Sequence, residues 1–440
     1  MLKRLPILAL LSGLFGAAGL KADTPYGGSA SFVHVSGTQY KVQATFFRNC
    51  RTVPFSGTMR ARLVSSCTTL NITLTRSGIR NASQRCAGAV TCNPGNSISS
   101  VDGFEAHTYE ATIDFAQAPY ASLLSSTCCQ VTFFAIRPGR APGITSLQNP
   151  AANGMGLSAV LQTCNLSAFS NGNSSAEIHT DFPFTIPASQ TAALSFQARD
   201  ADGDSLVYLL TPALDSNTFS KSYVSGFNFT SPITPYCLSG STCPAAPSAN
   251  PPRGFFLSRS TGDLVFQPAF GGETGVVVVQ IWEYRKLPSG SYTFVGFSSH
   301  ERQLAVTGST GNNAPSLNPA ASYTLCLNEK FCFRVKASDV ADTRSDTTRL
   351  GWSDDIRGAV MRIVDSSARE REVEFCWTPD SNAAQKSFHY FSVRASDNRC
   401  PLPLYTRRTY TFSILPKPDT RMRFSKHSGS RLFYEISNPS

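Results

Sequence analysis

"REVEFCWTPDSNAAQKSFHYFSVRASDN", residues 371–398, is the stretch that decides the fold class. Two runs in which apolar and polar residues alternate, 372–379 and 388–395, flank a segment of Pro, Asp, Ser and Asn. A period of two is the pattern of a strand with one buried face, and such a polar segment marks the turn between strands. The same alternation recurs at 39–47, 194–198 and 262–268. Because helical periodicity is nearly absent after residue 22, we predict an all-β chain of tandem antiparallel β-sandwich modules.

The chain also repeats this pattern in one order. Two pairs of segments are similar: 194–206 with 331–346, and 262–285 with 371–398. In each copy an alternating strand runs into a group of Asp residues, which predicts two diverged modules. Stretches rich in Pro, Gly and Asn, at 137–154 and 307–322, mark the boundaries. We therefore expect a signal peptide (1–22), a disulfide-rich N-terminal β domain (23–148), a first module (149–310), a second module (311–416) and a basic tail (417–440).

The N-terminus predicts export. Lys3 and Arg4 precede an apolar run from Leu5 to Leu20, the order of a secretory signal, and no later stretch is long enough for a transmembrane span. The net charge is +10, and seven Lys and Arg residues follow from Arg407 onward. No nucleic-acid-binding motif accompanies them, so we expect no nucleic-acid partner. The expected location is extracellular or on the outer cell surface.

Thirteen cysteines in an exported chain predict disulfides. Three pairs with five residues between them predict small closed loops: Cys86–Cys92, Cys237–Cys243 and Cys326–Cys332. A bond between Cys376 and Cys400 could join two strands of the second module. Cys128 and Cys129 are adjacent in a predicted strand and point to opposite faces, so they need different partners, among Cys50, Cys67 and Cys164. Because thirteen is odd, one thiol remains, and Cys164 beside a boundary is the candidate.

No pattern of catalytic residues is present. The six histidines lie singly, and neither a nucleophile-elbow motif nor a glycine-rich phosphate loop occurs. His389 lies within an alternating strand, and Trp282 and Trp377 lie beside other aromatic residues, so we expect all three to be structural. A β-sandwich glycosidase would need only two carboxylates across a cleft, and carboxylates are plentiful. A glycoside hydrolase and a carbohydrate-binding protein therefore stay open as alternatives.

Five motifs carry a family resemblance. They are "YGGSASFVHVSGTQYKVQATFFRNC" (26–50), "TCCQVTFFAI" (127–136), "DADGDSLVY" (200–208), "WEYR" (282–285) and "EFCWTP…VRASDNRCPLP" (374–403). In this order they resemble large exported bacterial surface proteins that are described as gliding-motility-associated or type 9-secreted. The resemblance implies immunoglobulin-, cadherin- or PKD-like modules. Two departures are the Cys-Cys-Gln sequence at 128–130 and the absence of a recognisable sorting domain after the second module.

Acidic residues gather at matching places in the two modules. Cadherin-like modules collect such residues from separate loops at one pole, where calcium stiffens the junction between domains. The resemblance therefore implies calcium ligands at Asp200, Asp202, Asp204 and Glu283 in the first module, and at Asp339, Asp342 and Asp397 in the second. The alternative is a hairpin turn, because Asp202-Gly203 is a favourable hairpin dipeptide. An EF-hand calcium loop does not fit, because Ser205 stands where that loop requires a glycine and Thr211 stands in place of its closing Glu.

These observations together predict a non-catalytic, secreted or cell-surface structural or adhesion protein. Repeated modules, expected disulfides and the missing catalytic motifs support this prediction, with calcium as the expected cofactor. The expected partners are other surface proteins or extracellular polysaccharide.

Overall fold

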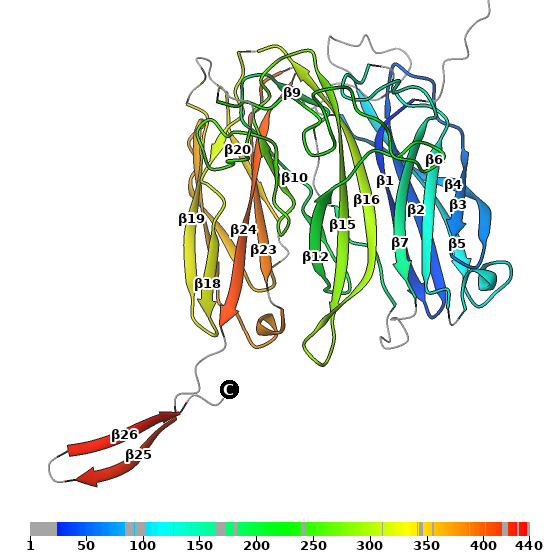
Figure 1. Cartoon of the computed structure of the whole chain (residues 1–440). Coiled ribbons are helices and arrows are strands. Elements are labelled where there is room, and N and C mark those ends of the chain that lie inside the picture. The colour runs from blue at the N-terminus through cyan, green and yellow to red at the C-terminus, as the bar shows by residue number, and fades with distance from the viewer. Residues whose placement is uncertain are drawn as a thin grey trace, which may run out of the picture.

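The computed structural model is almost entirely β-structure (Figure 1). It describes residues 24–83, 92, 103–125, 127–141, 143–163, 172–178, 183–238, 243–309, 311–340, 342, 346–353, 356–386, 388–400, 402–415, 421–428 and 431–437. The predicted signal peptide lies outside this part of the chain. Within it, two short 3-10 turns, η1 (Tyr120–Leu123) and η3 (Ala383–Gln385), are the helical elements, and no helix has the length and apolar character to cross a bilayer.

The N-terminal strands close into a ring. Each strand hydrogen-bonds to two neighbours in the order β1, β2, β5, β4, β3, β6, β7, β16 and back to β1. The ring consists of β1 (Pro25–Ser36), β2 (Gln39–Asn49), β3 (Thr58–Val64), β4 (Thr69–Asn81), β5 (Phe104–Asp114), β6 (Gln130–Arg137), β7 (Met155–Gln162) and β16 (Tyr292–Thr307). Alternate residues of these strands point inward, and Phe32, Phe46, Tyr109, Phe133 and Leu157 fill the interior. The period of two therefore builds this core.

The first module shares this sheet with the ring. Strands β15 (Thr274–Lys286) and β12 (Ser205–Leu210) extend it beyond β16, and β9 (Thr185–Pro187) pairs with β16 in parallel. A second layer consists of β10 (Ala192–Ser195), β14 (Asp263–Phe266) and β13 (Phe256–Leu257), with β8 (Glu177–Ile178) and β11 (Ala198–Arg199) pairing beside it. The two layers enclose a core that includes Phe196, Tyr208, Phe266 and Ile281.

The second module is a sandwich of two four-stranded sheets. One sheet has the order β17-β19-β22-β21 and the other β18-β24-β23-β20. The strands are β17 (Ser316–Leu317), β18 (Ser322–Cys326), β19 (Phe331–Ser338), β20 (Arg349–Trp352), β21 (Val360–Asp365), β22 (Glu370–Trp377), β23 (His389–Ser396) and β24 (Tyr405–Leu415). Phe375, Phe391, Tyr410 and Phe412 pack between the sheets. A hairpin of β25 (Arg421–Ser428) and β26 (Arg431–Ser437) stands apart from the rest (Figure 1).

The fold confirms the all-β prediction, but the expected N-terminal domain (23–148) and first module (149–310) share one sheet. The boundary expected between residues 148 and 149 falls between β6 and β7, which pair over their full lengths, and β1 also pairs with β16. The reason is that Leu157, Ala159 and Leu161 of β7 belong to the ring core. By contrast, the boundary expected near residue 310 coincides with the change from the eleven-stranded sheet to the two sheets of the second module.

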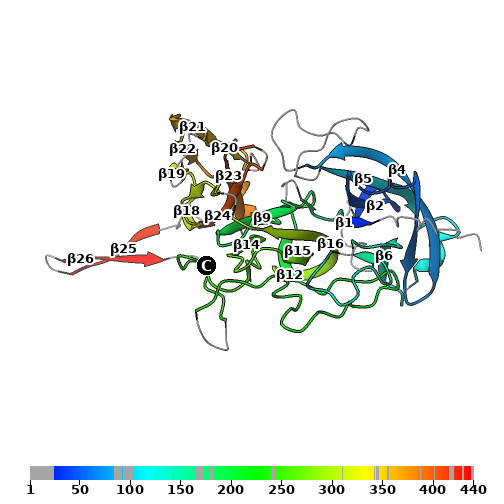
Figure 2. The ribbon, with the colours of Figure 1, turned by 90° about the horizontal axis from the view of Figure 1, so that it is seen from above.

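The two modules lie side by side (Figure 2), and β24 packs on β10. Asp263 of β14 is the polar centre of this contact, because its carboxylate accepts hydrogen bonds from the Thr409 backbone N–H (3.0 Å) and hydroxyl (2.7 Å). Tyr405 of β24 is part of the core of the first module. The contact is therefore lateral and runs along the strands.

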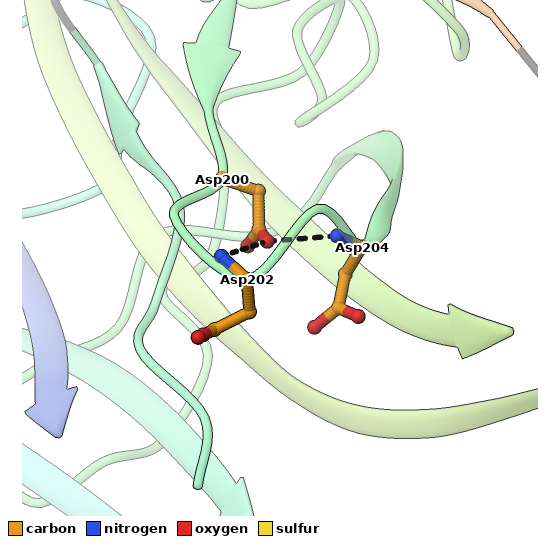
Figure 3. A group of neighbouring side chains, drawn as sticks. All are labelled: Asp200, Asp202 and Asp204. Atoms are coloured by element: carbon orange, nitrogen blue, oxygen red, sulfur yellow. Dashed lines mark hydrogen bonds between the residues drawn. The ribbon is translucent and has the colours of Figure 1, made fainter. Parts of the chain in front are cut away.

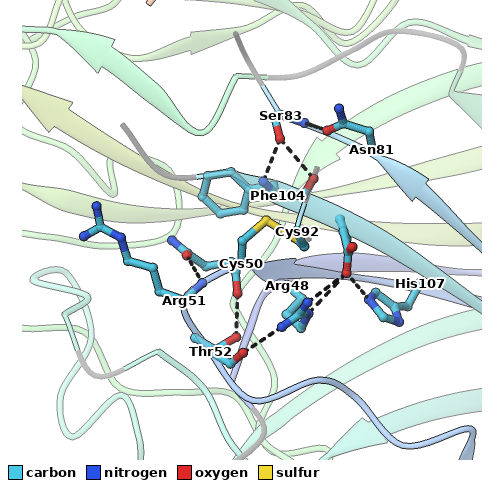
Figure 4. The surroundings of a disulfide bond; sticks show 11 residues. Arg48, Cys50, Arg51, Thr52, Asn81, Ser83, Cys92, Phe104 and His107 are labelled. Atoms are coloured by element: carbon cyan, nitrogen blue, oxygen red, sulfur yellow. Dashed lines mark hydrogen bonds and ion pairs between the residues drawn. A yellow bond between two sulfur atoms is a disulfide. The ribbon is translucent and has the colours of Figure 1, made fainter. Parts of the chain in front are cut away.

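The disulfides correct most of the expected pairings. Cys237–Cys243 is confirmed. Cys92 bonds Cys50 at the end of β2 and not Cys86, which lies outside the described residues (Figure 4). The short loop Cys86–Cys92 was expected from sequence spacing alone, whereas the fold brings Cys92 within a Cα–Cα distance of 4.9 Å of Cys50.

In the second module Cys332 bonds Cys376, so the expected pairs Cys326–Cys332 and Cys376–Cys400 are both wrong. The physical reason is register: Cys332 of β19 lies directly opposite Cys376 of β22, with a Cα–Cα distance of 4.2 Å, whereas Cys326 ends β18 in the other sheet. Cys326 is exposed and free.

Cys128 bonds Cys67, one of the partners considered for it. Cys129 and Cys400 are likewise disulfide-bonded. Cys164, the expected free thiol, lies outside the described residues. Four disulfides have both of their cysteines in the described part of the chain, and such a number is typical of an exported protein.

Candidate metal centres

The first acidic cluster lies in the loop between β11 and β12. Asp200 turns the loop, because its Oδ1 accepts hydrogen bonds from the backbone N–H groups of Asp202 (3.0 Å) and Asp204 (2.8 Å) (Figure 3). One oxygen from each of the three carboxylates lies within 4.8 Å of the others. Asp200 Oδ2 is buried without a hydrogen bond, and burial raises the pKa of this carboxyl to about 7. The loop therefore concentrates negative charge.

A guanidinium group enters this cluster. Arg285 of β15 donates from Nε and Nη2 to the two carboxylate oxygens of Asp204, both at 2.7 Å, and its Nη2 lies 3.6 Å from Asp202 Oδ2. Nη1 donates to the Gly172 carbonyl (2.6 Å), and Nη2 also donates to Asn173 Oδ1 (2.7 Å). This bidentate geometry is the strong form of an arginine–carboxylate pair. Arg285 thus supplies a cation to the cluster from within the protein.

Glu283 is fully buried two residues before Arg285. Its two oxygens accept hydrogen bonds from the Asn173 side-chain amide (2.8 Å) and the Ala176 backbone N–H (2.7 Å). Burial is the main cause that raises the Glu283 pKa to about 8, with Asp200 and Asp204 adding to it. Glu283 therefore fastens the segment 173–176 to β15, and the structure does not bring it into the carboxylate group with the three Asp residues.

The hairpin alternative for this loop is wrong. Strand β11 pairs with β8, whereas β12 pairs with β15 in the large sheet, so the loop crosses between two sheets. Gly203 has the positive φ (82°) expected of a turn glycine. The turn dipeptide was recognised correctly, but its local geometry does not determine which strands pair.

The second acidic cluster follows β19. Asp339, Asp342 and Asp346 bring one oxygen each within 4.8 Å of the others. Asp339 is only 1% exposed, and neither of its carboxylate oxygens has a hydrogen bond. Burial, followed by the charges of Asp342, Asp397 and Asp346, raises its pKa to about 6. Asp346 Oδ2 is also buried without a hydrogen bond.

Polar groups surround the second cluster. Both oxygens of Asp342 accept from the Asn313 backbone N–H at 3.1 Å, and Oδ1 also accepts from the Asn313 amide. Asp397 accepts from the backbone N–H groups of Arg399 (3.1 Å) and Leu404 (3.0 Å) and from the Asn312 amide (3.0 Å). Burial nevertheless raises the Asp397 pKa to about 6. These bonds hold Asp342 and Asp397 in place, but Asp397 does not join the group of three carboxylates, and Asp339 stays without a hydrogen bond.

The two clusters are built alike. In each module a Gly-Asn pair precedes the first strand, and an acid-x-Arg triplet follows at or after the end of a later strand. The corresponding residues are Gly172 and Gly311, Asn173 and Asn312, Glu283 and Asp397, and Arg285 and Arg399. The arginines differ: Arg399 Nη1 lies 3.6 Å from Asp346 and 3.9 Å from Asp342, whereas Arg285 is in bidentate contact with Asp204.

The hydrogen bonds and ion pairs described above for the carboxylates of each cluster come from one module. The first cluster uses residues between 172 and 285, and the second uses residues between 311 and 399. Each cluster therefore holds the segment that precedes the first strand of a module (Gly172–Asn173 or Gly311–Asn312) against that module. Hydrogen bonds between the two modules include those from Thr409 to Asp263 and one from the Gln190 amide to the Asn312 carbonyl (2.6 Å).

Sequence reasoning missed Asp346, Arg285 and the two asparagines of the entering segments. Asp346 was inside the repeated stretch 331–346, and its distance of four residues from Asp342 was the available signal. The Gly-Asn pairs lie some thirty residues from the acidic loops (Asn173 to Asp202 and Asn312 to Asp342) and carry no local signal. Only the fold brings these asparagines to the carboxylates.

The structure places Trp282, Trp377 and His389 in different environments. Trp377 is 2% exposed in the core of the second module, as expected. His389 is half-buried, and its Nε2 lies 2.9 Å from the Ala383 carbonyl oxygen. Trp282 differs from the expectation: it is half-buried on the face of β15 that points away from the core, and its ring lies in near-parallel contact with Phe297.

Comparison with known proteins identifies no family. No family model and no curated protein matches this chain. Among solved structures, the GspB Siglec domain has a TM-score of 0.18 at 9% identity over 24% of this chain, and the protocadherin gamma C5 EC1-3 structure has 0.21 at 13% over 39%. An endo-fucoidan hydrolase of glycoside hydrolase family 107 has 0.20 at 11% over 78%. The chain spans 60%, 55% and 39% of these structures, less than two thirds of each. These similarities are too low to assign a function.

Proposed function

We propose that this protein is a non-catalytic structural or adhesion protein, secreted or held at the outer cell surface, whose second module binds calcium. The order of the sequence motifs supports placing it among gliding-motility-associated or type 9-secreted surface proteins. Its partners are other surface proteins or extracellular polysaccharide. The disulfides and the tandem sandwich modules are in keeping with such a role.

Asp339 carries the calcium proposal. A carboxylate that is 1% exposed and lacks any hydrogen bond is costly to ionise unless a cation lies beside it. The carboxylates of Asp342 and Asp346 each bring an oxygen within 4.8 Å of one of its own, and the charge of Asp397 adds to the rise of its pKa. Calcium takes six to eight oxygen ligands, and the three carboxylates of Asp339, Asp342 and Asp346 supply hard oxygen donors for it.

The first cluster is the weaker candidate, because Arg285 already pairs with Asp204. The guanidinium group uses both oxygens of Asp204 and one of Asn173, which are oxygens that a metal ion would need. The sequence alone implied calcium ligands in both modules.

Titration calorimetry on EDTA-treated protein tests the proposal. We expect one calcium site per chain, lost in Asp339→Asn and retained in Asp200→Asn. Asp365→Asn, an exposed position in the same module, is the matched control and should retain the site. Calcium binding that is lost in Asp200→Asn and kept in Asp339→Asn would place the ion in the first cluster and contradict the assignment.

The absence of catalysis is tested separately. The purified protein should leave a panel of glycans, peptides and esters unchanged. Turnover of any of these substrates that a single carboxylate substitution abolishes would contradict the non-catalytic proposal.

A further inference from the structure

A cleft lies where the first acidic loop faces the second module. Its volume is about 260 Å³. Residues of the β11–β12 loop, together with Lys286 and Tyr292 at the end of the β15–β16 hairpin, line one side. Lys386 and Phe388, just before β23, line the other. The two sides approach closely, because a β-carbon at Gly203 would lie 3.8 Å from Lys386 Nζ.

The charge of the cleft is positive. Arg199, Lys286 and Lys386 are exposed and line it, one cation or more from each side. Asp204 also lines it, but its charge is balanced by the bidentate contact with Arg285. Asp200 also lines the cleft, so its lining residues carry three cationic and two carboxylate groups. The cleft therefore suits an anionic ligand.

Aromatic rings are exposed at both sides of the cleft. Tyr292 is 46% exposed and Phe388 is 52% exposed. From Tyr292 a row of half-buried rings continues along the outward face of β15 and β16, where residues opposite each other share one face. The row contains Trp282, Tyr284, Phe294 and Phe297, with Trp282 and Phe297 5.7 Å apart and 14° from parallel.

Rings of this kind suit a sugar chain. The C–H face of a pyranose is apolar and packs on an aromatic face, while its hydroxyl groups stay in water. Two exposed rings on opposite sides of a charged cleft can hold one or two sugar units, and the row beyond them can hold further units of the same chain. Ligand sites commonly combine such apolar surfaces with a few polar groups that fix orientation.

We propose that this cleft, with the aromatic row that leads to it, binds an acidic polysaccharide. Sugar rings pack on Tyr292 and Phe388, and carboxylate or sulfate groups lie between Lys286 and Lys386. The proposal deepens the proposed binding function by naming the polysaccharide and its site. It rests on that function only in that the protein acts by binding, and it does not involve the calcium cluster.

Binding of three probes to the full chain tests this at low salt in EDTA. The probes are galacturonate oligosaccharides, dextran sulfate and neutral dextran. We expect one or both anionic probes to bind and neutral dextran not to bind, and the stronger anionic probe identifies the acid group. Added salt should weaken binding, because the lysines are exposed. Equal binding of neutral dextran, or no binding of either anion, would overturn the proposal.

Two double variants separate this site from general attraction to a basic protein. Lys286→Gln/Lys386→Gln should lower the affinity roughly a hundredfold, from about tenfold for each charged contact. Arg60→Gln/Arg349→Gln removes the same charge at exposed positions outside the cleft and should leave the affinity within about threefold. Equal losses in the two double variants would show that binding is non-specific.

Phe388→Ala tests the stacking contact and should weaken binding roughly tenfold without changing its dependence on salt. Unchanged affinity in Phe388→Ala would overturn the role of the rings. Asp339→Asn should bind the saccharide normally, so loss of the calcium site and loss of the saccharide site are distinguishable.

Discussion

Replacing Asp339 by asparagine should stabilise the calcium-free protein and remove its response to calcium. The pKa of the carboxyl is about 6 against an ordinary 3.8, so its ionisation costs the folded state roughly 3 kcal/mol at pH 7.5. Asparagine has nearly the same shape and no charge, and its amide would lie beside the carboxylates of Asp342 and Asp346. Calcium at a hundred times its dissociation constant would stabilise the native protein by about 2.7 kcal/mol. The variant in EDTA should therefore be about as stable as the native protein in calcium.

The pH dependence has a definite sign. A carboxyl whose pKa is raised by folding adds no penalty below the unfolded value of 3.8, and the full penalty applies above about 6. The calcium-free native protein should therefore lose stability as the pH rises from 4 to 6 because of this group. Asp339→Asn should flatten that decline.

Urea unfolding at pH 7.5, in EDTA and in calcium, measures these effects. Trp377 is buried in the core of the second module, so tryptophan fluorescence follows the unfolding of that module, and Trp282 of the first module contributes to the same signal. Asp365→Asn is the control and should keep the calcium response of the native protein. If Asp339→Asn were less stable than the native protein in EDTA, or still gained stability from calcium, the argument from the unpaired carboxylate would be refuted.

Three further predictions concern other buried groups. Arg285→Gln leaves Asp204 buried without its partner and should destabilise the protein by about 3–5 kcal/mol in EDTA. Calcium should restore part of this stability by taking the place of the guanidinium group. Urea unfolding of Arg285→Gln/Asp339→Asn, which lacks the calcium site of the second module, measures this gain. Burial, followed by the charge of a neighbouring arginine, lowers the His300 pKa from 6.5 to about 3, so the native protein should lose roughly 4–5 kcal/mol from this group as the pH falls from 6.5 to 3. His300→Gln should show a shallower acid limb in urea unfolding at several pH values. Cys332→Ala/Cys376→Ala should cost about 3–4 kcal/mol, and peptide mapping without reduction should find this pair crosslinked.

The strand pattern was largely determined by the sequence. Segments such as 39–47, 372–379 and 388–395 alternate between apolar and polar residues, and each contains or overlaps a strand of the structure. Alternation is a local property of a chain that must bury one face, so it can be recognised without knowing which strands pair. The acidic loops and their place after strands were visible for the same reason.

Strand pairing, disulfide partners and the balance of charge in each cluster were decided by the tertiary structure. Cys332 meets Cys376 because of register between β19 and β22, and sequence spacing does not contain that register. Arg285 reaches Asp204 across eighty-one residues in a bidentate contact, whereas Arg399 lies 3.6 Å from Asp346 and 3.9 Å from Asp342, so two loops similar in sequence differ in how an arginine meets them. Contacts between distant segments depend on how whole sheets pack, and no local pattern of residues records that packing.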